Sequence, residues 1–433
     1  GIQSVDIASL PEGSILVAKD LTPSMTAGIN PENVVGIVTE LGGRTSHSAI
    51  LARALEIPAV VAVNGLMEQV QKGDFVVLDG DAGEVYVNPS QEVKESYEKK
   101  RQVFLQEKKD LEQYIGKPSV TKDGVQVEIV ANIGKPEDVD KVLQYDGEGV
   151  GLFRTEFLFM DRTAMPTEEE QFEAYKKVAA AMNGKPVIIR TLDIGGDKEI
   201  PYMGLEKDEN PFLGYRAIRF CLDRREDVYK PQLRALLRAS AFGNIRIMVP
   251  LVTCIEEYRQ AKALLEEIKK ELDEKGIAYN KDIQVGIMVE TAAASLIADI
   301  FAKEADFFSI GTNDLTQYTM SVDRGNKKVS YLYSTFNPAV LRSIKHIIAC
   351  GREAGIMVGM CGEAASDPMM IPLLLAFGLN EFSMSASAIL KARKMVTQYS
   401  VEELQAVADK AMSFATTAET EQYMRDFVEK VTD

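Results

Sequence analysis

Eight short apolar segments recur across residues 119–433, and stretches with a helical pattern separate most of them. Eight βα units in succession favour a closed (β/α)8 barrel, the TIM-barrel architecture. An open doubly wound sheet is the alternative, but the G-x-G-x-x-G loop that would favour it is missing. The expected strands are Val127–Ile133, Gly149–Phe153, Pro186–Ile189, Ile245–Val249, Gln284–Val289, Phe307–Ile310, Met357–Met360 and Glu381–Met384, and the expected helices include Glu168–Ala181, Ile255–Lys275, Ala292–Phe301 and Ala339–Ala354.

A different pattern precedes the predicted barrel. Residues 1–88 contain short β-rich segments bounded by Gly, Asp, Pro or Asn, which indicates a small α/β domain. Residues 91–114 lack Gly and Pro and are rich in charged side chains, so we expect a long solvated helix. We therefore predict three parts: a small domain (1–88), a helical linker (89–118) and a barrel domain (119–433). The expected strands of the small domain are Ser14–Ala18, Val34–Val38, Ala59–Val63, Phe75–Leu78 and Glu84–Val87, and a last helical stretch, Val401–Ala415 continuing into Thr420–Val431, is expected outside the barrel.

Charge and cysteine usage exclude several classes of function. The chain has 49 Lys and Arg against 65 Asp and Glu, a net charge of −16, which disfavours nucleic acid or an anionic membrane as a partner. Four cysteines without C-x-x-C spacing predict neither a zinc site nor a disulfide framework. Free thiols, the lack of a basic apolar leader and the lack of a membrane-length apolar run predict a cytoplasmic protein.

One of only two histidines, His47, stands in a sequence suited to phosphate chemistry. A strand-like stretch (34–38) and two glycines precede it, and a helix-forming stretch (48–55) follows. His47 is therefore expected near a helix N-terminus, where an anion is favoured and the hydroxyls of Thr45 and Ser46 can cap the helix or bind phosphate. A neutral imidazole can attack phosphorus. The alternative is a glycine turn, a hydroxyl cap and a surface histidine.

Polar side chains cluster where the predicted barrel strands end, the rim at which barrel enzymes keep their active sites. Arginine forks there match phosphate and carboxylate oxygens. Two carboxylates from neighbouring strands suit a divalent ion, and oxygen ligands favour Mg²⁺ over Zn²⁺. The set implies a small substrate with both a phosphate and a carboxylate. Its members are Arg154, Arg190, Asp193, Lys198, Glu290, Asn313, Asp314, Asp323, Arg324, Cys361 and Glu363.

Each member also has a structural explanation. Glu290 and Asp314 can form structural ion pairs with arginines, and Cys361 can be a small buried residue. Arg154 and Arg190 can form rim salt bridges worth about 0–1 kcal/mol. Arg216 and Arg219 can lie on a solvated helix face, and His346 fits a packed or half-exposed helix position without a catalytic role.

With these residues in place, the chain resembles the Enzyme I family of the bacterial phosphotransferase system, the phosphoenolpyruvate–protein phosphotransferases. The resemblance covers essentially the whole chain. The matching segments are GGRTSHSAILARALEIPAVV (42–61), GLFRTEFLFMDR (151–162), IRTLDIGGDK (189–198), NPFLGYRAIR (210–219), VETAAA (289–294), GTNDLTQYTMSVDRGN (311–326) and MCGEAASDP (360–368).

The resemblance implies a role for each matching residue. His47 is the nucleophile that takes phosphate from phosphoenolpyruvate, and Cys361 is the acid that protonates the enolate to give pyruvate. Glu290 and Asp314 ligate Mg²⁺, the implied cofactor. The phosphoenolpyruvate-binding residues are Arg154, Arg190, Arg324, Asn313 and Asp314, with Lys198 and Arg216. A swivelling domain that carries His47 and a homodimer are also expected.

Members of this family begin with a further strand and a helical subdomain that docks the phosphocarrier protein HPr. The sequence given starts at Gly1 without them. We therefore expect phosphorylation of His47 to be retained more readily than transfer to HPr. Two other functions remain open: a fragment of a dikinase-like enzyme (pyruvate phosphate dikinase or phosphoenolpyruvate synthase type) that also handles nucleotide, and a regulatory module that senses phosphoenolpyruvate without turnover.

Overall fold

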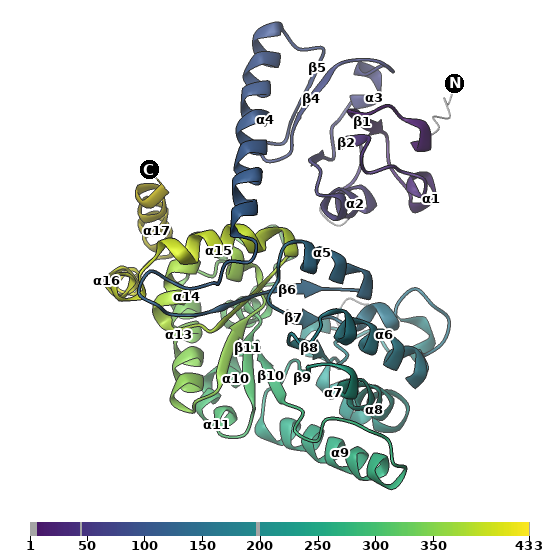
Figure 1. Cartoon of the computed structure of the whole chain (residues 1–433), viewed down its shortest axis with the longest axis vertical. Coiled ribbons are helices and arrows are strands. Elements are labelled where there is room, and N and C mark those ends of the chain that lie inside the picture. The colour runs from purple at the N-terminus through teal and green to yellow at the C-terminus, as the bar shows by residue number, and fades with distance from the viewer. Residues whose placement is uncertain (1–6, 44–45, 196–199, 433) are drawn as a thin grey trace. The chain divides into compact units, whose positions relative to one another are not determined.

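The computed structural model describes residues 7–43, 46–195 and 200–432 and divides the chain into two compact units (Figure 1). The first unit is Gly1–Asp110 and the second is Leu111–Asp433. Each unit has a hydrophobic core of its own.

Eight parallel strands form a closed barrel in the second unit, as predicted. The strands follow one another around the barrel in chain order, and β13 pairs with β6 to close it, with Glu381 opposite Glu128. The open doubly wound sheet is therefore excluded. The strands are β6 (Glu128–Ile133), β7 (Val150–Phe153), β8 (Val187–Arg190), β9 (Ile245–Val249), β10 (Val285–Val289), β11 (Phe307–Ile310), β12 (Met357–Met360) and β13 (Glu381–Met384).

Alternate residues of these strands face different surroundings, because successive side chains of a strand point to opposite faces. One face packs on the surrounding helices in the large core of this unit. The other face fills the barrel with a second cluster, which includes Leu152, Ile188, Met248, Met288 and Phe307. The barrel is therefore packed along its length, and its strand tips present polar groups at one end.

Helices surround the barrel (Figure 1). Two predicted helices are each divided in the structure. The stretch 292–301 breaks at Ile297, which leaves the helical region with φ −109° and ψ 27°. The C-terminal stretch breaks where the Thr416 hydroxyl accepts the Glu419 amide at 3.1 Å and starts a new helix. The helices are α5 (Val139–Gln144), α6 (Glu168–Ala181), α7 (Ile218–Asp223), α8 (Lys230–Ala239), α9 (Ile255–Glu274), α10 (Ala292–Leu296), α11 (Ala298–Ala302), α12 (Thr312–Met320), α13 (Pro338–Glu353), α14 (Ile371–Phe377), α15 (Ile389–Gln398), α16 (Val401–Ala411) and α17 (Thr417–Thr432).

The first unit contains a three-stranded parallel sheet in the order β1-β2-β3 and a separate antiparallel pair, β4 and β5. Strand β3 is shorter than the predicted 59–63, because Ala62 adopts φ +59° and ends the extended backbone. The elements are β1 (Ser14–Ala18), α1 (Pro23–Thr26), β2 (Val34–Thr39), α2 (His47–Leu55), β3 (Ala59–Val60), α3 (Leu66–Gln69), β4 (Val76–Asp79) and β5 (Glu84–Val87).

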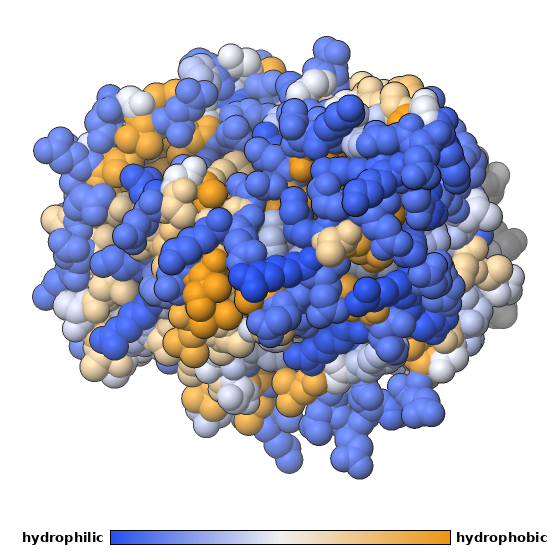
Figure 2. Space-filling view, turned by 90° about the horizontal axis from the view of Figure 1, so that it is seen from below, coloured by the Kyte–Doolittle hydropathy of each residue, from blue (hydrophilic) through white to orange (hydrophobic). Residues whose placement is uncertain are grey.

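The predicted long helix is α4 (Gln91–Leu111), followed by a 3-10 turn over Glu112–Tyr114. All its residues are described and none is buried, in agreement with the charged composition. Among the described helices, none combines the length and the apolar character that crossing a membrane requires. On the face of the molecule in Figure 2, hydrophilic side chains predominate and hydrophobic ones form smaller separate groups.

Candidate active site

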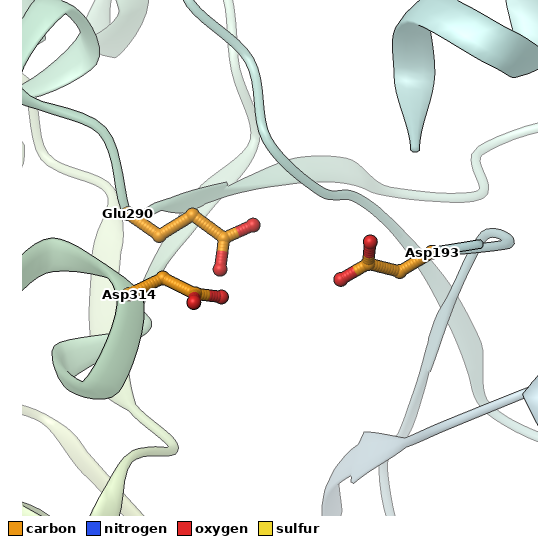
Figure 3. Close-up of side chains that lie close together, drawn as sticks. All are labelled: Asp193, Glu290 and Asp314. Carbon is orange, nitrogen blue, oxygen red and sulfur yellow. The ribbon is translucent and has the colours of Figure 1, made fainter. Parts of the chain in front are cut away.

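Three carboxylates from three strand ends meet at the rim of the barrel (Figure 3). Asp193 follows β8, Glu290 directly follows β10, and Asp314 lies in the first turn of α12 behind β11. One ligand oxygen from each lies within 4.8 Å of the other two. Glu290 and Asp314 lie side by side in Figure 3, and Asp193 points at them from the opposite side.

The carboxylate of Glu290 is buried, with 1% of the residue exposed. The amide of Leu251 donates a hydrogen bond to its Oε1 at 2.7 Å. Burial, followed by the negative charges of Asp314 and Asp193, raises the pKa of Glu290 well above its usual range. Three crowded oxygen donors with this electrostatic conflict fit a hard divalent cation, which relieves the repulsion.

Asp193 also holds two arginines. Its Oδ1 accepts a bond from Arg216 Nη2 at 2.9 Å, and its Oδ2 lies 3.6 Å from Arg190 Nη1. Arg216 is 6% exposed and also donates to the Tyr318 hydroxyl at 3.1 Å. The expectation of a solvated helix face for Arg216 is therefore wrong: it precedes α7 and is buried by its ion pair.

Arg190, the last residue of β8, is 7% exposed and forms a short, buried ion pair with Glu156. Burial alone would lower the pKa of Arg190, but the charges of Glu156 and Asp193 raise it above the usual value. Its guanidinium is thus permanently charged and fixed in direction.

Arg154 directly follows β7 and Arg324 lies in the segment after α12, and both residues are exposed. Although part of the residue is exposed, the surrounding groups remove water from the Arg154 guanidinium, and this desolvation, followed by the charge of Arg190, lowers the pKa of Arg154. The positive charges of Arg154 and Arg190 repel each other. An anion bound between them would relieve this repulsion. The Arg324 amide donates to Gln317 Oε1 at 3.2 Å. Lys198, the remaining predicted cation, lies outside the described residues.

Asn313 joins two loops of the rim. Its Oδ1 accepts the amide of Glu363 at 3.3 Å, and its backbone carbonyl accepts the Tyr333 hydroxyl at 3.0 Å. The first turn of α12 is thereby fixed to the loop after β12, which carries Cys361.

Cys361 directly follows β12 and is 7% exposed. Its thiol donates to the carbonyl of Ile310 at 3.8 Å, and its own carbonyl accepts a bond from Asn132 at 3.0 Å. Burial raises the pKa of Cys361 to about 11, against smaller opposing effects of Ser309 and Arg190. The thiol therefore holds its proton at neutral pH, as an acid must before it can donate one.

His47 is the first residue of α2, and Ser46 is its N-cap, accepting the amide of Ala49 at 3.5 Å. This is the predicted position at a helix N-terminus. The imidazole Nε2 makes a hydrogen bond of 2.8 Å with Thr26 Oγ1, a partner that local sequence did not reveal. Arg44 and Thr45 lie outside the described residues.

Sequence reasoning missed Glu156 and Thr26, and it placed Asp193 at the rim without assigning it a role. Glu156 lies two residues after Arg154, and Asp193 lies three residues after Arg190. Carboxylates this close to arginines at the rim could have predicted ion pairs there. Thr26 precedes His47 by 21 residues, and no pattern links the two positions.

Two family models match this chain. The family model of the PEP-binding domain of PEP-utilising enzymes matches residues 108–401, and that of their mobile domain matches residues 10–83. An NMR solution structure of Enzyme I aligns at 47% identity over 23% of this chain and 40% of that one, with a TM-score of 0.22, an overlap too small to carry an argument about the fold.

Relatives match nearly the whole chain. The phosphoenolpyruvate-protein phosphotransferase of Staphylococcus carnosus (strain TM300) is 52% identical over 99% of this chain and 74% of the relative. Those of Geobacillus stearothermophilus and Bacillus subtilis (strain 168) are both 51% identical over 98% of this chain. The aligned region covers 73% of the first relative and 75% of the second. The chain belongs to the phosphoenolpyruvate-protein phosphotransferase family.

Proposed function

We propose that this chain moves the phosphoryl group of phosphoenolpyruvate onto Nε2 of its own His47, releases pyruvate, and passes the phosphoryl group on to HPr. The observation that carries the proposal is the set of groups at one barrel rim: fixed guanidinium groups, three converging carboxylates and a protonated thiol. Such a set matches the phosphate, the carboxylate and the reacting methylene carbon of phosphoenolpyruvate.

Substrate binding is assigned to Arg154, Arg190 and Arg324, with Asn313. Arg190 supports this role because two carboxylates already fix its guanidinium, so little freedom is lost when an oxyanion binds. The amide of Asn313 lies on the loop pair that carries Cys361. Lys198 and Arg216 are assigned to the same site, Arg216 through the Asp193 carboxylate that it contacts.

Glu290 and Asp314, with Asp193 beside them, would hold Mg²⁺. Bound there, the ion would neutralise charge on the phosphoryl oxygens and orient the substrate. Their oxygen-only donor set and the raised pKa of Glu290 support this assignment.

His47 is the proposed acceptor. Its Nε2 must release the Thr26 hydroxyl to attack phosphorus in line, so this hydrogen bond holds the imidazole between turnovers. The N-terminus of α2 then favours the negative phosphohistidine. Domain 1–88 would carry His47 to the rim and away again on the linker 89–118.

Cys361 is the proposed acid. As the bond from phosphorus to the enol oxygen breaks, the enolate carbon takes the thiol proton, and the new C–H bond gives the methyl group of pyruvate. A thiol whose pKa lies near 11 keeps this proton until the strongly basic enolate carbon forms.

Two further assignments are proposals from family resemblance. A homodimer through the barrel domain is supported by the exposed apolar side chains of Leu296 and Ile300, 77% and 41% exposed, and sedimentation velocity tests it. A cytoplasmic location is supported by four free thiols.

Pyruvate release tests the reaction. We expect a burst of about one pyruvate per chain with phosphoenolpyruvate and Mg²⁺, because a single imidazole is filled. His47→Ala should abolish the burst, whereas His346→Ala, which changes the exposed histidine of α13, should retain it. A burst of equal size in His47→Ala would contradict the proposal.

A further inference from the structure

Ser309, in the middle of β11, has a buried hydroxyl group. Side-chain packing alone does not explain why a polar group is present at this position. The residue is fully buried, and its Oγ has no hydrogen-bond partner among the described residues. Phe307, two residues earlier, belongs to the cluster that fills the barrel. Because alternate residues share a face of a strand, the Ser309 side chain also points into the barrel. A buried polar group without a partner is costly, so a hydroxyl retained there calls for a function.

The Cys361 thiol is on the neighbouring strand end, on the same inner face. Ser309 pairs with Gly359 across β11 and β12, and Cys361 lies two residues beyond Gly359. The thiol proton points to the carbonyl of Ile310 at 3.8 Å, and the neutral sulfur is only a weak acceptor for the Ser309 hydroxyl. Ser309 nonetheless acts on the sulfur, because it lowers the pKa of Cys361 against the effect of burial.

We propose that Ser309 is a positioning residue for proton transfer: its hydroxyl donates a hydrogen bond to the Cys361 sulfur once the thiol has given its proton to the enolate carbon. The inference rests on the proposed function of Cys361 as the acid. The S–H bond breaks and its electron pair stays on sulfur as the thiolate. The enolate electron pair forms the C–H bond of the pyruvate methyl group, and a proton from water later restores the thiol.

The arrangement places a donor where charge develops during the reaction. The neutral thiol is a weak acceptor for this donor and the thiolate a strong one, so the interaction favours the state after proton transfer over the state before it. Charged groups also act on the sulfur: Arg190 and Arg154 favour the thiolate and Glu290 opposes it. Ser309 adds stabilisation without adding a charge that would compete for the substrate.

Deuterium exchange into pyruvate measures this step directly. The full chain is incubated with phosphoenolpyruvate, pyruvate and Mg²⁺ in D₂O, and NMR follows the loss of the pyruvate methyl protons. We expect Ser309→Ala to slow exchange on the order of 10-fold, the effect of one hydrogen bond to a charged group, with KM for phosphoenolpyruvate unchanged within about twofold. Ser309→Thr, which keeps the hydroxyl, should recover most of the rate. Thr316→Ala removes another buried, unpaired hydroxyl, on α12, and serves as the control.

A second readout needs no turnover. Alkylation of Cys361 by iodoacetamide at pH 9, followed by peptide mass spectrometry, reports its thiolate fraction and should fall in Ser309→Ala but not in Thr316→Ala. Cys361→Ala distinguishes a failure of the proposed acid, Cys361, from a failure of the proposed positioning residue, Ser309. If Cys361→Ala exchanges as fast as the unaltered chain, the proposed acid is wrong. If Cys361→Ala is inactive in exchange while Ser309→Ala matches the unaltered chain, or Ser309→Thr fails to recover the rate, the role of Ser309 is wrong.

Discussion

The guanidinium group of Arg190 is fixed from two sides, by Glu156 and by Asp193, and all three side chains are buried. An arginine held in this way loses little entropy when it binds an oxyanion. Glu156 lies two residues beyond Arg154, so the end of β7 supplies both a proposed substrate-binding residue and the residue that fixes its neighbour.

Glu156→Gln should therefore weaken both substrate binding and stability. The substitution removes the closer of the two carboxylates that pair with the buried Arg190 charge, which costs about 3 kcal/mol. The displaced Arg190 should also raise KM for phosphoenolpyruvate roughly 10-fold, the factor that about 1.4 kcal/mol represents. Urea unfolding and steady-state kinetics measure the two effects. Glu304→Gln is the control, because its pair with Arg259 lies at the solvent-exposed surface and should contribute little to stability. Equal stability losses in the two variants would contradict this account.

The strand ends are the elements that build the site, and close packing fixes the loop after β12. A Cβ added at Gly362 would lie 1.8 Å from Thr312 Oγ1, at the start of α12. The loop that carries Cys361 thus lies against the helix that carries Asp314, and only glycine leaves room for that approach.

Gly362→Ala should force these two elements apart. We expect a loss of about 1–3 kcal/mol from overpacking and slower pyruvate release, since the thiol moves with its loop. Gly134→Ala is the matched change at another strand end, where the nearest atoms lie at 3.9 and 4.0 Å. Thermal unfolding and the pyruvate burst compare the variants, and an unaltered burst in Gly362→Ala would refute the argument.

At the opposite end of the barrel, a buried carboxyl, Glu381, lies beside a half-buried one, Glu128. Glu381, the first residue of β13, lies opposite Glu128 of β6. Burial, followed by the charge of Glu128, raises the pKa of Glu381 to about 8, and Arg246 opposes this only in part. Between about pH 4.5 and pH 8 the folded chain therefore holds a proton that the unfolded chain has released.

This proton predicts a pH-dependent stability. The contribution of Glu381 is fully present below about pH 4.5 and is lost as pH rises through about 8. At about 1.4 kcal/mol per pKa unit, the rise from 4.5 to about 8 corresponds to a loss on the order of 5 kcal/mol. The Gln side chain in Glu381→Gln cannot ionise. As pH rises from 5 to 8.5, the unfolding free energy of the unaltered chain should therefore fall relative to that of Glu381→Gln. Urea titrations across this range that give parallel curves for both proteins would rule the effect out.

The barrel strands could be predicted because buried parallel strands read as nearly continuous apolar runs. The breaks at Ile297 and before Thr417 could not, because the apolar pattern continues across them while the backbone turns. Glu290, Asp314 and Cys361 were found because strand ends of a barrel share a rim. The Thr26 contact and the Glu156–Arg190 pair join positions 21 and 34 residues apart, which only folding brings together.

At the scale of the whole molecule, two units with separate cores are joined through α4, a helix without buried residues. The small unit is built on a core that includes Leu16, Val34 and Ile37. The proposed substrate site, apart from His47, belongs entirely to the barrel unit.

Ligand binding should therefore stabilise one unit and not the other. A ligand at 100 times its Kd adds about 2.7 kcal/mol to the unit that binds it. In His47→Ala, which prevents turnover, phosphoenolpyruvate with Mg²⁺ should raise the unfolding temperature of the barrel unit and leave that of the small unit unchanged. Differential scanning calorimetry shows this as a growing gap between two transitions, and equal shifts of both would argue against separate units.

The position of the transferred phosphoryl group tests the central claim most directly. After brief incubation with ³²P-labelled phosphoenolpyruvate and Mg²⁺, the protein is digested under alkaline conditions and its labelled peptide is identified by mass spectrometry. The account predicts acid-labile label on Nε2 of His47, strongly reduced by Glu290→Gln or Asp314→Asn and lost in His47→Ala. Label on any other residue, or equal labelling of His47→Ala, would contradict it.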